Sequence, residues 1–269
     1  MRRILPYILG VLMLFSCGNS NAGKPASAEK KTVTRPGRIL EYRLEVVAEY
    51  PHDVTSYTQG LFFHEGELYE TTGQYGSSTL RKVDLATGKA VERQDFDDKY
   101  FIEGSVVLGD NIYILTWQEH AVFVYDAETF EHRSTKTYPR EGWGITTDGK
   151  QLIASDGTSF LYFMNENLDV QRKVQVKAGS RAVPWLNELE YIGGKVWANI
   201  YTSDEIAIIN PTSGYVEGVI DCRDLLPKEL RTYDTDVLNG IAYDSATGKL
   251  YLTGKNWPKL YEVKVVEKK

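Results

Sequence analysis

Hydrophobic and polar residues alternate in short runs along most of the chain, and the same order of runs recurs five times. In each repeat a Gly-, Asp- or Asn-containing turn precedes an apolar pair. The five pairs are Leu68-Tyr69, Ile112-Tyr113, Leu152-Ile153, Val196-Trp197 and Leu250-Tyr251. Alternation with a period of two is the pattern of half-buried strands, and no window keeps a helical period. Repeats of about 40 to 54 residues with four short strands each are typical of β-propeller blades.

The pattern therefore predicts an all-β fold, a five-bladed β-propeller that forms one domain. The fifth repeat lacks a fourth strand, whereas Tyr42 to Tyr50, ahead of the first repeat, has a strand pattern. We expect this N-terminal strand to pair with the C-terminal blade, so that the chain ends close the ring and no long edge stays exposed. An insertion from Asp221 to Asp236 precedes the last repeat, and Leu225 to Leu230 within it favours a short helical turn.

The N-terminus has a different pattern. Arg2 and Arg3 precede an apolar stretch, Ile4 to Phe15, that is too short to span a bilayer and has the length of a signal-peptide core. The following Leu14-Phe15-Ser16-Cys17 resembles the lipobox of bacterial lipoproteins, in which the cysteine is lipidated. The alternative is an ordinary secretory signal with an incidental cysteine.

These features divide the chain into three parts. We interpret residues 1–16 as a lipoprotein-type signal peptide, 17–38 as a flexible tether rich in small and polar residues, and 39–269 as the propeller domain. We expect an exported protein that is periplasmic or anchored in the outer membrane, and that touches the membrane only through a lipid on Cys17. With Cys17 used in this way, Cys222 has no partner for a disulfide and suits a packing role.

Charge and composition narrow the classes of function. The 269 residues include 37 acidic and 31 basic side chains, a formal net charge of −6. No basic stripe is present, which argues against a nucleic-acid partner. The four histidines show no paired spacing for zinc. We expect no cofactor. A monomer is expected.

The repeat also gathers unusual residues. Equivalent turns lead into the five innermost strands, and propeller symmetry brings them to one mouth of the central channel. These turns carry Gln59, Glu103, Trp143, Asn187 and Asn239. The ends of the second strands lie beside them and carry Trp117, Tyr201 and Lys255. The glycines after Gln59, Glu103 and Asn239 are suited to tight turns. A carboxylate beside Phe101 and Ile102 is costly in apolar surroundings, and its pKa is expected to rise.

Ordered motifs extend over almost the whole of the domain, from about Arg43 to Val266. They include Pro51-His52-Asp53, Tyr57-Thr58-Gln59-Gly60-Leu61, Phe101-Ile102-Glu103-Gly104-Ser105, Leu115-Thr116-Trp117, Glu141-Gly142-Trp143-Gly144, Leu186-Asn187-Glu188, Leu238-Asn239-Gly240 and Thr253-Gly254-Lys255-Asn256-Trp257. Together they resemble the plant- and bacterial-type glutaminyl cyclases (glutaminyl-peptide cyclotransferases). That resemblance implies a five-bladed propeller that converts the N-terminal glutamine of a peptide or protein to pyroglutamate, with release of ammonia and without a metal.

The resemblance also implies the site. The family's pocket corresponds to Tyr57, Gln59, Phe101, Glu103, Trp117, Trp143, Asn187, Tyr201 and Lys255. Tyr57 replaces a frequent Phe and Tyr201 a frequent Trp, so we expect an altered substrate preference with the chemistry retained. Glu103 is expected to take the proton of the α-amine and pass it to the leaving ammonia. Asn187, Gln59 and Lys255 are alternative donors to the oxyanion.

Two other functions compete with this interpretation. A calcium-dependent propeller hydrolase of the lactonase type would use Glu103, Asn187 and Asn239 as oxygen ligands, with Asp156 or Asp236 added. A non-catalytic propeller would bind a ligand at the same mouth without turning it over. Survival of activity in the presence of a chelator separates the first alternative from a metal-free cyclase.

Overall fold

A computed structural model describes residues 37–269 of the chain, and strands occupy most of that length. The predicted signal peptide, the predicted lipidation site Cys17 and nearly all of the predicted tether lie outside the described residues. No helix within residues 37–269 is long and apolar enough to cross a membrane.

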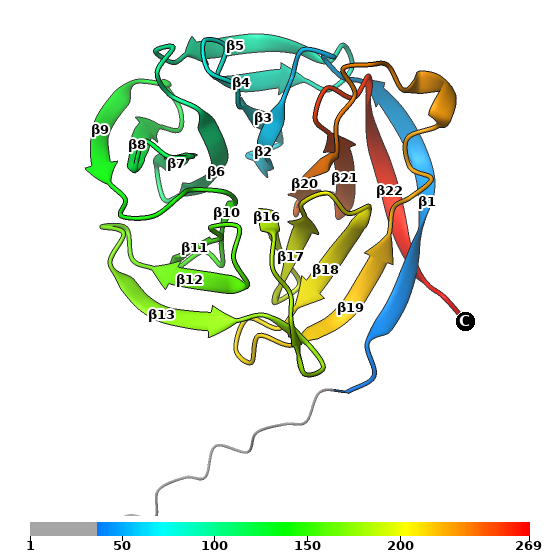
Figure 1. The fold of residues 1–269 in the computed structure, drawn as a ribbon. Helices are drawn as coiled ribbons and strands as arrows, with labels where there is room; N and C mark the ends of the chain where they lie inside the picture. The colour runs from blue at the N-terminus through cyan, green and yellow to red at the C-terminus, as the bar shows by residue number, and fades with distance from the viewer. Residues whose placement is uncertain (1–36) are drawn as a thin grey trace, which may run out of the picture. The chain divides into compact units, whose positions relative to one another are not determined.

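Apart from β1, the strands form antiparallel sheets in which neighbours in the sheet follow one another along the chain (Figure 1). Three sheets have four strands each. They contain β2 (Thr58–His64), β3 (Glu67–Thr72), β4 (Thr79–Asp84) and β5 (Lys89–Asp95); β6 (Ile102–Leu108), β7 (Asn111–Thr116), β8 (Ala121–Asp126) and β9 (His132–Thr137); and β10 (Ile145–Thr147), β11 (Leu152–Ala154), β12 (Phe160–Met164) and β13 (Val170–Gln175).

The remaining long strands form an eight-stranded sheet with the order β16-β17-β18-β19-β1-β22-β21-β20. Its strands are β16 (Leu186–Ile192), β17 (Lys195–Ile200), β18 (Glu205–Ile209), β19 (Val216–Asp221), β20 (Leu238–Asp244), β21 (Lys249–Gly254), β22 (Lys259–Glu267) and β1 (Leu40–Pro51). A small hairpin of β14 (Lys177–Ala178) and β15 (Arg181–Ala182) precedes β16.

Strand β1 links the two halves of this sheet. It pairs antiparallel with β22, from Tyr42 opposite Glu267 to Pro51 opposite Lys259. Its first residues also pair in parallel with β19, a contact that the sequence pattern does not predict. The first strand of the described residues thus lies hydrogen-bonded between two strands from the C-terminal half.

Apolar side chains fill the spaces between neighbouring sheets. Because successive side chains of a strand point to opposite faces, Leu61 and Phe62 on β2 belong to different clusters. Leu61 packs with Ala242 and Tyr251 of the eight-stranded sheet, whereas Phe62 packs with Ile102 of the next sheet. Five such clusters, each shared by two adjacent groups of strands, hold the sheets around a common centre.

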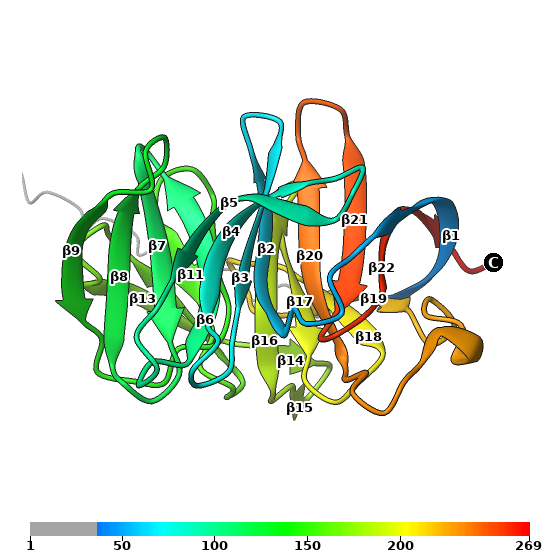
Figure 2. The same ribbon diagram turned by 90° about the horizontal axis from the view of Figure 1, so that it is seen from above.

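The sheets are arranged as a ring in which β2, β6, β10, β16 and β20 lie nearest the centre and β5, β9 and β13 lie outside (Figures 1 and 2). This arrangement confirms the predicted all-β, propeller-like fold. The only helix among residues 37–269 is a 3-10 turn, Lys228–Leu230, within the stretch where a helical turn is predicted. Cys222 is buried among apolar side chains of the same insertion, and burial raises the pKa of its thiol.

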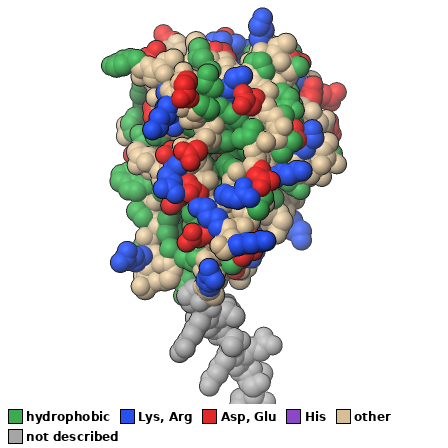
Figure 3. Space-filling view, turned by 90° about the vertical axis from the view of Figure 1, so that its right-hand side faces the viewer, with side chains coloured by type: hydrophobic (Ala, Val, Ile, Leu, Met, Phe, Trp, Pro, Cys, Tyr) green, Lys and Arg blue, Asp and Glu red, His purple; other side chains and the backbone are tan. Residues whose placement is uncertain are grey.

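The side of the ring seen in Figure 3 shows no separation of charge. Lys and Arg side chains alternate with Asp and Glu over the side of the ring that faces the viewer in Figure 3. Some of these side chains form ion pairs. Nζ of Lys259 on β22, for example, lies 3.5 Å from Oε2 of Glu49 on β1. Such exposed pairs contribute little to stability, about 1 kcal/mol or less each.

Candidate active site

A cavity of about 360 Å³ opens where the innermost strands begin. This volume is within the range of small-molecule sites, roughly 300–1,000 Å³. Its lining consists of Tyr57, Gln59, Phe101, Glu103, Trp117, Trp143, Trp185, Asn187, Tyr201 and Lys255. The structure thus brings together all nine residues of the predicted pocket, and adds Trp185.

Irregular strand pairing directs several of these side chains. The register shifts between Thr58 and Gly60 on β2, between Ile102 and Ser105 on β6, and between Leu186 and Leu189 on β16. Gln59, Glu103 and Asn187 lie within these shifts. Bulges of this type commonly turn a side chain toward a site, which explains why the same position of each repeat faces the cavity.

The glycines next to these side chains allow the inner strands to approach one another. A Cβ atom on Gly104 would lie 2.8 Å from the backbone nitrogen of Ile145, and one on Gly60 would lie 2.6 Å from that of Ser105. Neither distance is sterically possible. The sequence interpretation of these two glycines as tight-turn residues is therefore incomplete, because the neighbouring strand itself excludes a larger residue.

Glu103 is a buried carboxylate, 5% exposed. Burial raises its pKa well above the usual value of 4.5; the charge of Lys255 opposes that rise, and the charges of Glu119 and Glu141 add to it. No group within residues 37–269 donates a hydrogen bond to the carboxylate of Glu103. The side chain therefore has its hydrogen-bonding capacity free for a molecule in the cavity.

Lys255 supplies the positive charge of the site and is 3% exposed. Burial lowers its pKa from 10.5, against the opposing charges of Glu103 and Asp236. Its Nζ lies 4.5 Å from the ring centroid of Tyr57 and 5.3 Å from that of Tyr201. Within the described residues no carboxylate oxygen lies within 4.0 Å of this nitrogen, so Lys255 and Glu103 face one cavity without forming a direct ion pair.

The amide side chains differ in how they are held. Asn239 does not line the cavity; it is fully buried, and its Nδ2 donates to the Thr58 carbonyl at 2.9 Å and to Gln59 Oε1 at 3.2 Å. This contact fixes Gln59 with its amide nitrogen free. Asn187 is also buried, and its Oδ1 has no partner within the described part of the chain. This oxygen is sealed from solvent, whereas Nδ2 of Asn187 donates no hydrogen bond within residues 37–269, so Gln59 and Asn187 can each offer a ligand an amide N–H group.

Aromatic rings form the walls. Phe101 meets the ring of Tyr57 edge-on at 6.2 Å and that of Trp117 at 5.6 Å between centroids, and Trp143 meets Tyr201 at 5.6 Å. The hydroxyl of Tyr57 donates to Asp236 Oδ2 at 3.1 Å. That hydroxyl is therefore occupied by Asp236, and Tyr57 offers the cavity mainly the face of its ring.

Two residues that contribute to the site, Glu141 and Trp185, were not among the predicted site residues. Glu141 Oε2 accepts the indole N–H groups of both Trp117, at 3.0 Å, and Trp143, at 3.1 Å, and so fixes two walls of the cavity. Trp185 lies at the edge of the cavity. Both stand two positions before a predicted ring residue, as do Tyr57 and Phe101, and this offset is the signal that would have found them.

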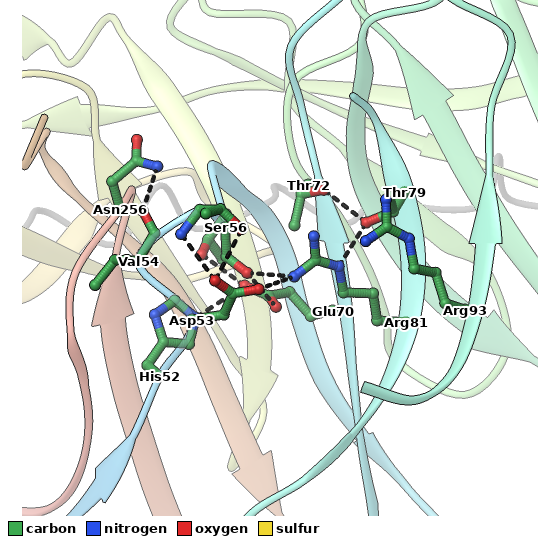
Figure 4. Close-up of polar contacts among 12 residues, drawn as sticks. His52, Asp53, Val54, Ser56, Glu70, Thr72, Thr79, Arg81, Arg93 and Asn256 are labelled. Carbon is green, nitrogen blue, oxygen red and sulfur yellow. Dashed lines mark hydrogen bonds and ion pairs between the residues drawn. The ribbon is translucent and has the colours of Figure 1, made fainter. Parts of the chain in front are cut away.

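A polar network that includes His52, Ser56, Glu70 and Arg81 lies next to the start of β2 (Figure 4). The ring of His52 contacts the Trp257 carbonyl through Nδ1 at 2.7 Å and Glu70 Oε1 through Nε2 at 2.9 Å. Thr58, between Tyr57 and Gln59, donates to the same Glu70 oxygen at 2.7 Å. The network thereby joins the start of β2 to the turn that carries Lys255.

The acidic residues proposed as calcium ligands are not gathered. No group of three or more His, Cys, Asp or Glu side chains suited to a metal ion occurs within residues 37–269. Asp236 accepts the Tyr57 hydroxyl, and Asp156 accepts the hydroxyl and the N–H of Thr158.

Comparison with known proteins gives consistent matches. The family model described as glutamine cyclotransferase matches residues 17–265. A glutaminyl-peptide cyclotransferase of Arabidopsis thaliana is 44% identical over 227 residues, which cover 82% of this chain and 71% of that protein. The crystal structure of a Myxococcus xanthus glutaminyl cyclase superposes with a TM-score of 0.81 at 33% identity, over 86% of this chain and 100% of the other.

Proposed function

The chain belongs to the glutamine cyclotransferase family, and we propose that it closes the N-terminal glutamine of a peptide or protein to pyroglutamate, with Glu103 moving the proton. The predicted family and the predicted enzyme class, glutaminyl-peptide cyclotransferase, are confirmed. The observation that supports the role of Glu103 is its isolation: a buried carboxylate without a hydrogen-bond donor, in the same cavity as a buried ammonium.

The reaction joins two atoms of one residue. The α-amine attacks the carbon of the side-chain amide, the amide nitrogen leaves as ammonia, and a five-membered lactam forms. Because nucleophile and electrophile belong to the same molecule, holding the glutamine in a folded conformation supplies a large part of the rate. The rings of Phe101, Trp117 and Trp143 are positioned to impose that shape and to keep water out.

Proton transfer requires one group with two successive roles. The amine attacks in its neutral form. As the lactam forms, the attacking nitrogen must lose one proton, and the departing nitrogen must gain one. Glu103 takes the first proton as a carboxylate and delivers it to the leaving group as a carboxylic acid. A raised pKa suits both steps, since it brings the carboxylate closer in basicity to the groups with which it exchanges protons.

The oxyanion of the tetrahedral intermediate needs donors in a dry site. Asn187 and Gln59 line the cavity, and the side-chain N–H groups of both donate no hydrogen bond within residues 37–269; Gln59 is oriented by Asn239. Lys255 contributes a positive charge nearby. We assign the oxyanion contacts to the amides of Asn187 and Gln59, with Lys255 stabilising the developing negative charge.

The direct test is incubation of the purified protein with a peptide that begins with glutamine, followed by mass spectrometry and an ammonia assay. Loss of one ammonia per peptide is expected, and it should persist after treatment with a chelator. A peptide that begins with asparagine is the matched control, because it carries the same amide on a side chain one methylene shorter. Absence of ammonia release from the glutamine peptide would refute the proposed activity.

Export and anchoring are a second part of the proposal and rest on the N-terminal sequence alone. Residues 1–16 act as a signal peptide, Cys17 receives a lipid, and the domain acts as a monomer on peptides outside the cytoplasm. Incorporation of labelled palmitate into the full chain, and its loss in Cys17→Ser, tests the lipid. Labelling that is unchanged in Cys17→Ser would overturn it.

A further inference from the structure

Trp185 differs from the other aromatic residues of the cavity in its exposure. Its side chain lines the cavity, yet the residue is 53% exposed, whereas Trp117, Trp143 and Tyr201 are partly buried. A large indole exposed to solvent at the edge of a pocket has apolar surface available for a ligand. Trp185 therefore belongs to the rim of the cavity.

The backbone holds this indole in place despite an unfavourable conformation. Trp185 has a φ of +65°, a region that bulky residues rarely adopt. Its N–H donates to the Gly157 carbonyl at 2.8 Å, and its carbonyl accepts the N–H of Tyr201 at 2.8 Å. These two bonds fix the residue between the third and fourth groups of strands. Strained residues that are held in this way concentrate at ligand sites.

The ring of Trp185 continues one wall of the cavity toward solvent. Its centroid lies 6.2 Å from that of Trp143, with 41° between the planes, and 6.5 Å from that of Tyr201, with 50°. Three aromatic side chains thus form a continuous apolar surface, which we call the rim surface, from the interior of the cavity to its opening.

The chemistry of the reaction directs the rest of the peptide across this surface. The α-amine and the side-chain amide of the glutamine must both reach Glu103, which is buried and lines the cavity. The remaining part of the substrate is attached at the α-carbonyl and has to leave through the open side. The exposed indole of Trp185 is available to the first side chain that it carries outward.

We propose that Trp185 is a specificity-determining residue that binds the side chain of the second residue of the substrate and favours an aromatic or large apolar side chain there. The inference rests on the proposed function. Contact between two aromatic rings, together with the apolar area that it buries, corresponds to about a three- to tenfold gain in kcat/KM over a second residue without a side chain.

The test compares two substrates that differ only at the second position, Gln-Phe-amide and Gln-Gly-amide. The measured quantity is the ratio of their kcat/KM values. In Trp185→Ala this ratio should fall by about three- to tenfold, as aromatic contact predicts, and Trp185→Phe should retain most of it. Tyr233→Ala is the matched control, because Tyr233 is a fully exposed aromatic residue that does not line the cavity. It should leave both kcat/KM values unchanged.

A third variant separates the indole from the backbone. Asparagine adopts positive φ more readily than alanine, so Trp185→Asn removes the ring and is less prone to unfold. An unchanged ratio in folded Trp185→Asn, checked by circular dichroism, would overturn the proposal. If the wild-type protein turns over neither peptide, the proposed function fails and the affinities for the two peptides are compared by calorimetry instead. A preference for Gln-Phe-amide that is lost in Trp185→Asn would still support the rim surface, and equal affinities would refute it.

Discussion

Glu103 on β6 and Glu70 on β3 are both buried glutamates, 5% and 2% exposed, in neighbouring sheets of the ring. Burial alone raises the pKa of each carboxyl. For Glu70 the contacts with His52, Arg81 and Thr58 more than offset burial, so its pKa is lowered. For Glu103 the more distant Lys255 does not offset burial, and the pKa is raised well above 4.5.

The difference lies in the donors. Glu70 accepts hydrogen bonds from Ser56 and Thr58 and pairs with the ring of His52, so its negative charge is compensated in the folded protein. Glu103 faces a cavity and has no donor of its own among the described residues. The first arrangement stabilises a fixed charge, whereas the second leaves a charge that a bound ammonium group would stabilise. Similar burial therefore indicates a structural role in one region and a chemical role in the other.

Glu103→Gln should produce the largest change in activity. The variant keeps the shape of the side chain but cannot exchange a proton, so we expect kcat to fall by about 10²- to 10⁴-fold. The midpoint of thermal unfolding should stay the same or rise, because an uncompensated buried acid is removed. Steady-state ammonia release and calorimetry measure the two effects. Glu128→Gln, on an exposed turn, is the control and should keep the wild-type activity. Activity near the wild-type level in Glu103→Gln would refute the assignment of Glu103 as the group that moves the proton.

Glu70→Gln should have the opposite effects to Glu103→Gln: a large loss of stability and little loss of activity. Without the carboxylate, His52 is left buried beside an uncharged partner, and we expect a loss of about 3 to 5 kcal/mol in the free energy of unfolding. Chemical denaturation gives this value, and Glu92→Gln on the exposed strand β5 is the control for a carboxylate of the same sheet. Well below the unfolding temperature, Glu70→Gln should retain most of the wild-type kcat. A loss as deep as that of Glu103→Gln would mean that the two regions are not separate in function.

The contrast between these regions also marks what the sequence could predict. The repeat fixes which turns meet at the centre of the ring, so Gln59, Glu103 and Asn187 could be placed together although they are far apart in the chain. Asn239 occupies an equivalent position yet turns away from the cavity to hold Gln59. The symmetry of the backbone thus predicts location better than the direction of a side chain.

The sequence pattern does not predict contacts that depend on the exact register of neighbouring segments. The partner of Glu70 is His52, eighteen positions away, in a segment that precedes β2 and contacts the β21–β22 turn. Nothing in the alternation of apolar residues encodes that meeting. Nor does it encode the contacts of Glu141, in which one carboxylate oxygen, Oε2, accepts the indole N–H groups of both Trp117 and Trp143.

A third buried glutamate, Glu190, shows whether uncharged hydrogen-bond donors are sufficient to offset the effect of burial on the pKa of a carboxyl group. Glu190 on β16 accepts the N–H of Tyr243 at 3.0 Å and the hydroxyl of Thr146 at 3.4 Å, with no cation beside it. Burial raises the pKa of Glu190 to about 8 despite these bonds. Between pH 4.5 and 8 the unfolded chain releases this proton while the folded chain keeps it. Stability is therefore fully present below the unfolded pKa and declines as pH rises through this window.

Glu190→Gln should reduce that decline. The wild-type free energy of unfolding should fall by up to a few kcal/mol between pH 5 and pH 8, at about 1.4 kcal/mol per pKa unit, and that of the variant by less. Urea denaturation at a series of pH values measures both slopes. Glu128→Gln, on the exposed turn, should keep the wild-type slope. Equal slopes in wild type and Glu190→Gln would show that backbone donors compensate the charge as fully as His52 does for Glu70.

The smallest effect is expected from Glu141, which acts on Glu103 from a distance. Its negative charge raises the pKa of Glu103, and both indole bonds go to one oxygen, Oε2, which the carbonyl of a glutamine can replace. Glu141→Gln should therefore keep the walls of the cavity and move the acidic limb of the kcat/KM profile to lower pH, by about a few tenths of a unit at an effective dielectric constant near 20. The peptide amine titrates identically with either protein, so only the enzyme group shifts the curve. An acidic limb that stays in place, or moves to higher pH, would mean that Glu103 does not set it.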